Sequence, residues 1–446
     1  MSSTQDRPDL CVIGASEAGL AACLGAVALG LSCVLVDDGD QSGYRNPDLT
    51  LAMLARAAAD PARHAAAWTG LAQALAAAAP DRSHARFGAL NVRLLRGRAR
   101  FIDAATLQVG DATLRARRVF IATGGIQPSH RLAAGLPQGA CLTVADVGQW
   151  RERPRAVLVV GGGLEALSIA QSLARLGSRV TLMSDALLPD VDPELAAPLL
   201  AQLRQDGVTI VPGPLQGVEA SPGGVEARLP DGTSIEATHL ILAEAWRPAL
   251  EALDLARAGV ATNAQGLVLD AGLRTSRRTI LAIGRAAGAG SSPEGIMQAG
   301  HALKTAFTPV PGRLRPECVP VVSATLPEIA TVGRLPAAAA ARIWRWPLSQ
   351  TGGALLAVDR DGSLKVVTDR HGRILWVGLV GSEVRELISF WSLAIARNLT
   401  LADLGDVLAP LPSRSEAHRA IVVQEIGRRL ASPWVRRALN VMRRLG

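Results

Sequence analysis

Apolar runs alternate with glycine-rich turns in the first forty residues of the chain. Leu10–Ile13 is an apolar run typical of a buried strand, and residues 14–19 form a small-residue turn that opens an alanine-rich helix. Gly30 predicts the end of this helix, and residues 32–36 form a second apolar run that leads to Asp37. Residues 18–36 carry no charge and are long enough to cross a membrane, but their glycines and the aspartate that follows favour a strand–helix–strand unit.

The first turn has the residue types of a dinucleotide-binding loop. Gly14 stands where the chain bends tightly, Ser16 is a small residue where the backbone meets a pyrophosphate, and Gly19 stands where the helix packs on the strand. Asp37 follows Gly14 by 23 residues, the distance at which an acid accepts hydrogen bonds from the ribose. We expect these four residues to bind a dinucleotide. The alternative is a packing turn of an ordinary α/β protein.

A second unit of the same kind begins at Ala156. Residues 156–160 predict a buried strand, residues 161–166 a turn, residues 167–176 a helix, and residues 179–183 the next strand. Gly161, Gly163 and Ala166 take the three turn positions, and Ser184 stands at the ribose position, followed by Asp185. These residues predict an NAD(P)H site, with NADH favoured over NADPH. The alternative is a domain of the same shape that binds no nucleotide.

Further apolar and alternating stretches predict the remaining elements. Strands are expected at residues 119–121 and 280–284, the first followed by Ala122, Thr123, Gly124 and Gly125, and a helix at residues 49–79 with a break at Pro61. Alternation predicts β-meanders in residues 93–118 and 209–243. After a linker at residues 309–316 we expect a small antiparallel sheet (residues 318–332, 353–368 and 373–379) and a helix at residues 382–396.

Composition narrows the function classes. The chain is 49% hydrophobic and 19% charged, which fits several packed cores rather than a disordered chain. The net charge of +8 raises the question of nucleic-acid binding, but aromatic residues make up only 3% and no reading motif occurs. The five cysteines form neither a CxxC pair nor a Cys/His zinc spacing, so we expect no metal site. Their small number, and the absence of a signal peptide, favour a cytoplasmic protein.

The order of these motifs over residues 8–420 resembles the FAD-dependent pyridine nucleotide-disulfide oxidoreductases, among them glutathione reductase, dihydrolipoamide dehydrogenase and mercuric reductase. In this resemblance residues 14–37 and Ala122–Gly125 correspond to FAD motifs, Gly161–Ala166 to the NAD(P)H turn, and Gly284 with Arg285 to the end of the FAD return strand. The resemblance implies an α/β fold with two Rossmann-like domains and a C-terminal α+β dimerisation domain, hence a homodimer. The implied ranges are FAD domain 1–150 and 266–312, NAD(P) domain 151–265, dimerisation domain 313–424 and a tail 425–446.

The residues of the family's redox centre are missing. The family places a Cys-x4-Cys disulfide and then a lysine against the flavin, whereas residues 41–51 contain neither residue type. Ser168 replaces the lysine's glutamate partner, Leu411 the general-base histidine, and Arg285 the aspartate that binds the FAD ribityl chain. Thiol chemistry needs a thiolate and a matched base. The sequence therefore predicts a degenerate member without thiol–disulfide reductase activity.

Few residues are left as candidates for that centre. Tyr44 could stack on a flavin and Arg45 could stabilise its anionic reduced form, while turn and surface roles are the alternatives. His418 lies two residues after Glu416, on a different side of the same helix, so it replaces the lost base poorly. Arg285 removes an acceptor for a ribityl hydroxyl but could contact an FAD phosphate.

The last residues predict a basic amphipathic helix. Ser432 is a good N-cap and Pro433 suits the first helical position. Trp434, Val435, Ala438, Leu439, Val441, Met442 and Leu445 would share one face, with Arg436, Arg437, Arg443 and Arg444 opposite. Such a helix suits an anionic membrane surface or an acidic groove. The alternative is a tail packed on its own dimer.

Together these features predict a homodimeric FAD protein that passes electrons from NAD(P)H through flavin directly to a quinone, oxygen or another acceptor. The competing hypothesis is an inactive scaffold or binding protein of the same fold. In either case the tail offers a peripheral contact with the inner face of the membrane.

Overall fold

The computed structural model describes residues 7–38, 47–60, 84–127, 135–137, 139–150, 152–229, 232–244, 246–309, 312–336, 341–357 and 361–445, together with single positions between 68 and 77. The chain forms two compact units. The first comprises Met1–Met53, Arg63–Val160 and Leu215–Leu314, and the second comprises Leu54–Ala62, Gly161–Pro214 and Arg315–Gly446. The five domain ranges expected from the sequence remain predictions.

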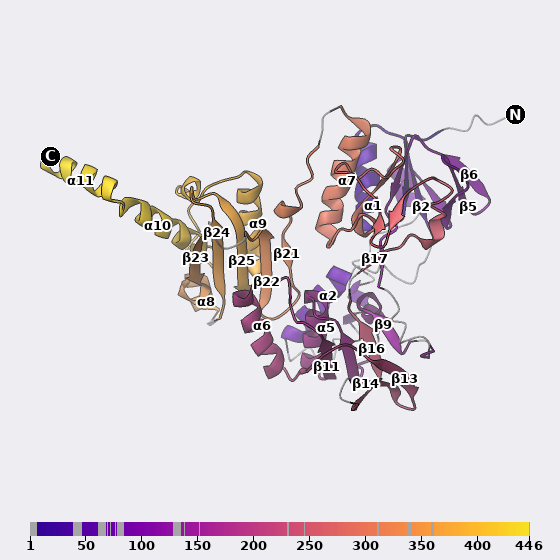
Figure 1. Cartoon of the computed structure of the whole chain (residues 1–446), viewed down its shortest axis with the longest axis horizontal. Coiled ribbons are helices and arrows are strands. Elements are labelled where there is room, and N and C mark those ends of the chain that lie inside the picture. The colour runs from indigo at the N-terminus through magenta and orange to yellow at the C-terminus, as the bar shows by residue number, and fades with distance from the viewer. Residues whose placement is uncertain are drawn as a thin grey trace. The chain divides into compact units, whose positions relative to one another are not determined.

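A parallel sheet forms the centre of the first unit (Figure 1). Its strand order is β20-β7-β1-β2-β3, with β1 at Leu10–Ile13, β2 at Cys33–Asp37, β3 at Val92–Arg96, β7 at Arg118–Ile121 and β20 at Ile280–Ala282. Every residue of β1 and β2 is buried. Strands buried on both faces carry continuous apolar runs, which is the pattern that predicts residues 10–13 as a strand. That prediction is confirmed residue for residue.

Successive residues of β1 point into two different cores, as a strand requires. Leu10 and Val12 pack with helices α1 (Glu17–Ala28) and α7 (Ser292–Phe307) on one face. These two helices lie side by side in Figure 1, and a Cβ atom at Gly25 of α1 would lie 2.5 Å from the Leu303 side chain of α7. Cys11 and Ile13 face the other core, which is covered by the antiparallel strands β4 (Ala99–Phe101), β5 (Thr106–Val109) and β6 (Ala112–Arg115).

The first unit also contains three parallel strands, β10 (Ala156–Val160), β16 (His239–Leu242) and β9 (Cys141–Thr143), and the antiparallel meander β13 (Gly217–Ser221), β14 (Gly224–Arg228) and β15 (Ser234–Ala237). A short antiparallel pair joins β8 (Gly125–Ile126) to β17 (Arg247–Pro248). Helix α2 spans Pro47–Ala59 and α4 spans His84–Ala89. The break expected at Pro61 lies outside the described residues.

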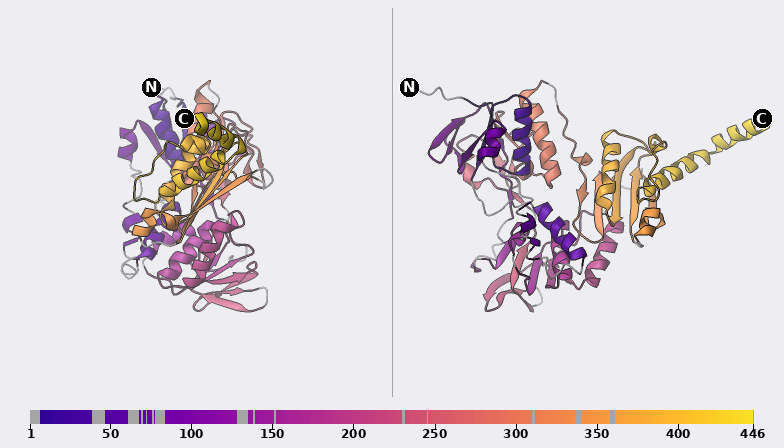
Figure 2. Two further views of the ribbon diagram at one scale, coloured as in Figure 1. Left: turned by 90° about the vertical axis from the view of Figure 1, so that its left-hand side faces the viewer. Right: turned by 180° about the vertical axis from the view of Figure 1, so that it is seen from behind.

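The second unit holds α5 (Leu164–Arg175), β11 (Arg179–Ser184), α6 (Pro193–Gln205) and β12 (Thr209–Pro212), with β11 and β12 parallel. It also holds an antiparallel sheet of order β21-β22-β25-β24-β23, with strands at Val321–Val322, Glu328–Gly333, Ile374–Gly381, Ser363–Thr368 and Arg342–Pro347. Helices α9 (Val384–Ala396) and α10 (Glu416–Leu430) cover this sheet around the fully buried Trp391. The final helix α11 (Pro433–Leu445) runs on from α10 away from the sheet (Figure 2).

The prediction of a strand across residues 353–368 is only half right. Gly352–Leu356 is a short helix, α8, because the Thr351 side chain accepts a hydrogen bond from the Ala354 amide at 3.3 Å and caps it. The edge strand β23 at Arg342–Pro347 was not expected. Its side chains alternate between half-buried and exposed positions, and an exposed edge shows the weaker apolar signal.

A buried lysine ties α6 to the antiparallel sheet within the second unit. Lys365 of β24 is 7% exposed, and its Nζ donates to Asp192 at 2.8 Å and to Glu194 at 2.7 Å. Arg345 of β23 makes two further bonds of 2.7 Å to Glu194. The hydrogen bonds from Arg345 and then from Lys365 lower the pKa of Glu194 to about 2.

Replacing this lysine tests the tie. We expect Lys365→Met to lower the unfolding free energy by roughly 3 kcal/mol, because it leaves the buried Asp192 carboxylate without its cation. The matched control is Lys304→Met, the other lysine of the chain, which is exposed on α7 and should change stability by no more than about 0.5 kcal/mol. Urea denaturation followed by circular dichroism measures both, and equal midpoints for the two variants would contradict the role of Lys365.

Candidate functional site

The first dinucleotide turn joins β1 to the N-terminus of α1. A Cβ atom at Gly14 (φ +108°) would lie 2.4 Å from the carbonyl oxygen of Ala122, and one at Gly19 would lie 2.2 Å from the carbonyl oxygen of Gly14. Only glycine allows both contacts. Ser16 caps the helix, since its hydroxyl accepts a hydrogen bond from the Gly19 amide at 3.2 Å. The backbone geometry that the sequence predicts is therefore present, with the positive end of the helix dipole at the turn.

The expected ribose acid lies at the end of the neighbouring strand. Asp37 ends β2, and its carboxylate is ion-paired with Arg96, which stands opposite it in β3. The Asp37 side chain is only 6% exposed. An ionised carboxylate has about four acceptor positions, so this ion pair and hydrogen bonds from ribose hydroxyls are compatible. Sequence patterns did not predict Arg96 as a partner.

The segment after β7 closes the same edge of the sheet. The Ala122 amide donates to the Ile13 carbonyl at 2.8 Å, and Gly124 has φ +76°. The Thr123 hydroxyl is buried and has no hydrogen-bond partner among the described residues. Because a buried hydroxyl without a partner is costly, it marks a position where a bound molecule would complete the structure. Glycine turn, helix N-terminus, acid and orphaned hydroxyl together fit the polar half of FAD.

Arg285 occupies the position of the family's ribityl-binding aspartate and packs within the first unit. Its guanidinium carbon lies 4.1 Å from the ring centre of Trp246, a cation–π contact, and a Cβ atom at Gly125 would lie 3.3 Å from its Cβ. The preceding Gly284 (φ +67°) approaches Ala18 of α1 and donates its amide to Gln298 at 2.9 Å. Neither Trp246 nor Gln298 was predicted from the sequence as a site residue. The only sequence signal at Trp246 is a tryptophan shortly after the alternating stretch that ends at residue 243, whereas nothing in the sequence points to Gln298.

The second dinucleotide turn is built differently. Gly161 has φ +140°, Gly163 precedes α5 with open space at its α-carbon, and Ala166 is fully buried. A Cβ atom at Gly162, however, would lie 1.9 Å from the carbonyl oxygen of Ala186 and 2.4 Å from the Ser184 hydroxyl. The Ser184 hydroxyl itself donates to the Ala186 carbonyl at 2.8 Å. The chain's own segment 184–186 thus packs against Gly162, between the two motif glycines, and uses the Ser184 hydroxyl expected at the ribose position. The space at Gly163, where the backbone would meet a pyrophosphate, stays open.

Three described residues correspond, in the resemblance, to members of the family's redox centre: Ser168 and Leu411 are other residue types there, and Glu416 is retained. The Ser168 hydroxyl, in place of the glutamate, donates to the Leu164 carbonyl of its own helix at 2.7 Å. Leu411, in place of the base, is 79% exposed. Glu416 accepts hydrogen bonds from the amides of Ser413 at 2.7 Å and Gly352 at 3.1 Å, so it closes a turn. Tyr44 and Arg45 lie outside the described residues and remain candidates from the sequence alone.

The cysteines of the first unit lie in its core. Cys11, Cys23 and Cys33 are buried, and Cys23 lies within hydrogen-bonding reach of Cys33. Burial raises the pKa of Cys11, and the hydrogen bond with Cys33, followed by burial, raises the pKa of Cys23. Burial also raises the pKa of the half-buried Cys141 and Cys318. A thiol with a raised pKa carries little thiolate, which is the reactive form.

His418 is buried in the core of the second unit and is not placed as a general base. Its ring stacks on Phe390 at 4.6 Å and meets the edge of Trp391 at 5.2 Å, beside a cavity of about 190 Å³. Its Nε2 has no partner among the described residues. Burial lowers the pKa of His418 to about 4, so the ring is neutral near pH 7.

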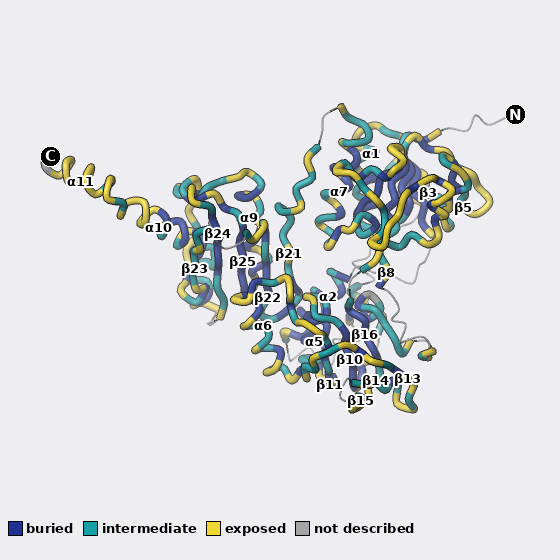
Figure 3. Tube along the Cα trace, viewed as in Figure 1, coloured by how far each residue is buried: buried dark blue, intermediate teal, exposed yellow. Residues whose placement is uncertain are grey.

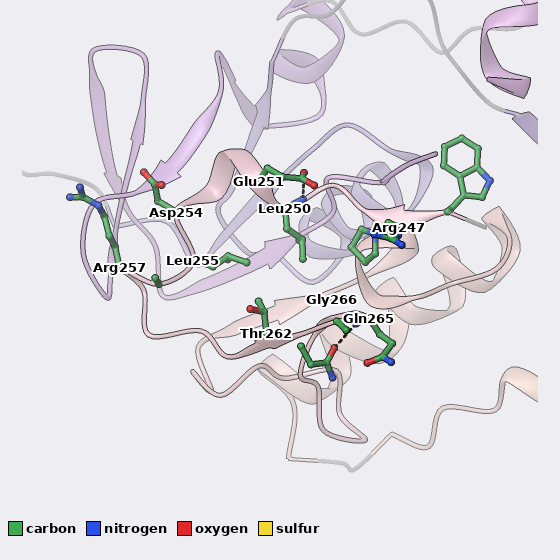
Figure 4. Close-up of a pocket in the computed structure, with 14 residues that line it drawn as sticks. Arg247, Leu250, Glu251, Asp254, Leu255, Arg257, Thr262, Gln265 and Gly266 are labelled. Carbon is green, nitrogen blue, oxygen red and sulfur yellow. Dashed lines mark hydrogen bonds between the residues drawn. The ribbon is translucent and has the colours of Figure 1, made fainter. Parts of the chain in front are cut away.

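A pocket of the first unit, about 820 Å³, is lined by residues between Trp246 and Gly266 (Figure 4). Its polar groups serve local turns: Glu251 accepts from the Leu250 amide at 3.2 Å, and Asn263 accepts from the Gln265 amide at 2.9 Å. In Figure 4 Arg257 lies beside Asp254 at one end of the pocket, and Arg247 lies towards the other end. The lining combines polar and apolar residues whose polar groups bond to one another, and it contains no nucleophile–base pair. We therefore assign this pocket no reaction.

The comparisons with known proteins agree with this architecture. A family model for pyridine nucleotide-disulphide oxidoreductases matches residues 8–306, and the model of their dimerisation domain matches residues 319–421. The chain is 30% identical to a mercuric reductase of Lysinibacillus sphaericus over 344 residues, which are 73% of this chain, and it spans 62% of that protein's length. It is 32% identical to a dihydrolipoyl dehydrogenase of Thermus scotoductus over 348 residues, 73% of each chain.

Among solved structures, the copper(II) complex of the HOCl-induced flavoprotein disulfide reductase RclA from Escherichia coli superposes with a TM-score of 0.82 at 20% identity, covering 94% of this chain and 99% of that one. The predicted class, an α/β protein with FAD and NAD domains and a C-terminal dimerisation domain, is confirmed. Among the described residues, none of the helices is both long and apolar enough to span a membrane.

The buried histidine predicts a pH dependence. Its pKa of about 4 in the folded state lies below the ordinary 6.5, so its contribution to stability is complete above pH 6.5 and is lost as the pH falls towards 4. Between pH 7 and pH 4 the unfolding free energy of wild type should fall further than that of His418→Leu. The difference between the two falls should be on the order of 3 kcal/mol. Denaturation at a series of pH values measures this. His84→Gln, at an exposed histidine, is the control that should follow wild type; parallel curves for His418→Leu would contradict the assignment.

The second turn offers a matched pair of glycine substitutions. Gly162→Ala should destabilise the chain by about 2 kcal/mol or more, because its Cβ meets the backbone of Ala186 and that segment must move. Gly163→Ala, with nothing near its α-carbon, should be close to neutral. Thermal unfolding compares the two. If both variants unfold at the same temperature as wild type, segment 184–186 does not pack against Gly162.

Proposed function

Because the chain belongs to the pyridine nucleotide-disulphide oxidoreductase family, we propose that it is a flavoprotein oxidoreductase that works without a redox-active disulfide. Members of the family, including dihydrolipoamide dehydrogenase, mercuric reductase and RclA, use FAD and NAD(P)H. The observation that carries the proposal is a contrast. The FAD-side turn keeps its glycines, helix cap and acid, whereas the cysteines, the lysine, its glutamate partner and the histidine expected of the thiol centre are other residue types.

The chemistry that FAD supplies when bound is the transfer of two electrons from NAD(P)H to an acceptor such as a quinone or oxygen. The chain's own part is binding and electrostatics. Gly14 and Gly19 would let the backbone approach the pyrophosphate, Asp37 would accept hydrogen bonds from the adenosine ribose, and the Thr123 hydroxyl would gain a partner. Arg285 would bring a positive charge where the family has an acid, which favours an anionic group beside it.

The absence of a suitable thiol supports direct transfer to the acceptor. Residues 39–46 contain no cysteine, and the three cysteines of the FAD-side core are buried, two of them with raised pKa values. A disulfide between Cys23 and Cys33 would lie inside the core, away from any exposed substrate. The family's dimerisation domain at residues 319–421 supports a homodimer, and the exposed Leu393, Leu408 and Leu411 give it apolar surface to bury.

One observation favours a second candidate, a binding or scaffold protein of the same fold without catalysis. The Ser184 hydroxyl, expected at the ribose position of the NAD(P)H turn, already donates to the Ala186 carbonyl at 2.8 Å. A turn whose ribose position is used by the chain itself would bind NAD(P)H weakly, and no electrons would enter by that route. The flavin could then remain as a structural ligand.

Spectroscopy separates the two candidates. We expect the purified dimer to carry a flavin absorption spectrum that anaerobic NADH bleaches, with NADPH less effective because Asp185 would repel a 2′-phosphate. A colourless protein that takes up no added FAD would overturn the flavoprotein proposal. A coloured protein that neither nucleotide bleaches would leave the scaffold.

Cysteine replacement then tests the mechanism. NADH oxidation with a quinone acceptor should proceed within about twofold of wild type in a Cys23→Ala, Cys33→Ala variant that retains flavin. The Cys141→Ser, Cys318→Ser variant is the matched control for the remaining thiols. Loss of turnover only in the first variant, at unchanged flavin content, would show that a disulfide takes part.

A further inference from the structure

Helix α11 at the end of the chain is largely exposed over residues 433–443. It spans Pro433–Leu445 and begins as the sequence predicts, with the Ser432 hydroxyl accepting a hydrogen bond from the Val435 amide at 3.4 Å. Trp434 is 82% exposed, and Val441 and Met442 are also largely exposed. Figure 3 shows α11 almost entirely in the colour of exposed residues. An apolar helix face of this kind needs something to cover it.

The two faces of α11 are sharply separated. At 100° per residue the apolar residues fill one side over an arc of about 160°, and Arg436, Arg437, Arg443 and Arg444 fill the other. A coiled-coil seam is much narrower than this arc. Residues 431–446 contain no acidic side chain, so the arginines have no counterion within the segment.

The preceding helix is built in a different way. Glu425 of α10 has a fully buried side chain and binds Arg428 at 2.7 Å and Arg429 at 2.6 Å. Burial alone would raise the pKa of Glu425, but the two arginine hydrogen bonds outweigh it and hold the pKa below its ordinary value. Arg429 also donates to the His371 carbonyl at 3.4 Å. Both arginines, counted with the basic tail in the sequence, are therefore paired within α10, and Arg429 also links α10 to the turn between β24 and β25.

The family's dimerisation domain ends before this helix. The match stops at residue 421, so α11 lies beyond the part of the chain for which the family accounts. A broad apolar face, a tryptophan at one end and four arginines without acids are the features of helices that lie in the interface of an anionic membrane. Such a helix is too short to be stable alone in water, which adds to the need for a surface.

We propose that α11 binds the surface of a bilayer that contains anionic lipids. The apolar face would enter the boundary between headgroups and acyl chains, and the arginines would contact the anionic headgroups. The anchored α10 would hold the rest of the protein at the surface without any membrane-spanning segment. This proposal is independent of flavin binding and of electron transfer.

Vesicle sedimentation with the full-length protein tests the proposal. We expect binding to vesicles of phosphatidylcholine mixed with phosphatidylglycerol, weak binding to phosphatidylcholine alone, and release by added NaCl. Each arginine near an anionic surface is worth a factor of about five in affinity. The variant with Arg436, Arg437, Arg443 and Arg444 changed to Gln should therefore bind more than about a hundredfold more weakly, and Trp434→Ser with Met442→Ser should also weaken binding.

The matched control changes four exposed arginines elsewhere, Arg93, Arg98, Arg277 and Arg278, to Gln and removes the same charge. It should bind vesicles within about fivefold of wild type. Equal loss in both variants would mean that net charge, not α11, causes binding and would overturn the proposal. Binding that does not depend on phosphatidylglycerol would overturn it as well. If truncation after residue 431 dissociates the dimer in the absence of lipid, a second copy of the chain is the occupant instead.

Discussion

Close backbone contact at glycine is the constraint on which both dinucleotide turns depend. At Gly14 the contact is with Ala122, at the end of β7. The turn therefore packs directly on this strand, and the N-terminus of α1 remains open. At Gly162, between the motif glycines of the second turn, the contact is with Ala186, which follows β11. In both turns a glycine thus allows a backbone contact that any side chain would block.

The scaffold of the family and the residues of its thiol centre rest on different interactions. Parallel strands with fully buried side chains, such as β1 and β10, are held by area buried from water, which many apolar sequences supply. The thiol centre needs a few residues of one type in one place. In this chain Ser168 makes a hydrogen bond within its own helix, Arg285 contacts the Trp246 ring, and Leu411 is exposed.

The sequence predicted the buried strands well and the edges of the fold poorly. Leu10–Ile13 and Ala156–Val160 were correct to the residue because buried parallel strands are continuous apolar runs bounded by glycine. Helix α5 begins at Leu164, three residues before its expected start, since the turn glycine itself serves as N-cap. The exposed β23 and the capped α8 were missed because neither has a strong pattern. Within the site, the glycines were predictable from spacing. The ion pair of Asp37 with Arg96 and the contact of Gly162 with Ala186 could not be predicted, because they depend on which side chains and segments meet across strands.

Lys365 has one further consequence, for the chemistry of the folded chain. Acylating reagents attack a neutral, accessible amine, and the Lys365 amine is buried and ion-paired with Asp192. The only other lysine, Lys304, lies exposed on α7. In the native protein an amine reagent should therefore mark the Lys304 side chain alone, and reaction at Lys365 would report the moments at which the sheet and α6 separate. Because the chain has only two lysines, mass spectrometry that detects a second acyl group would report local opening of this unit.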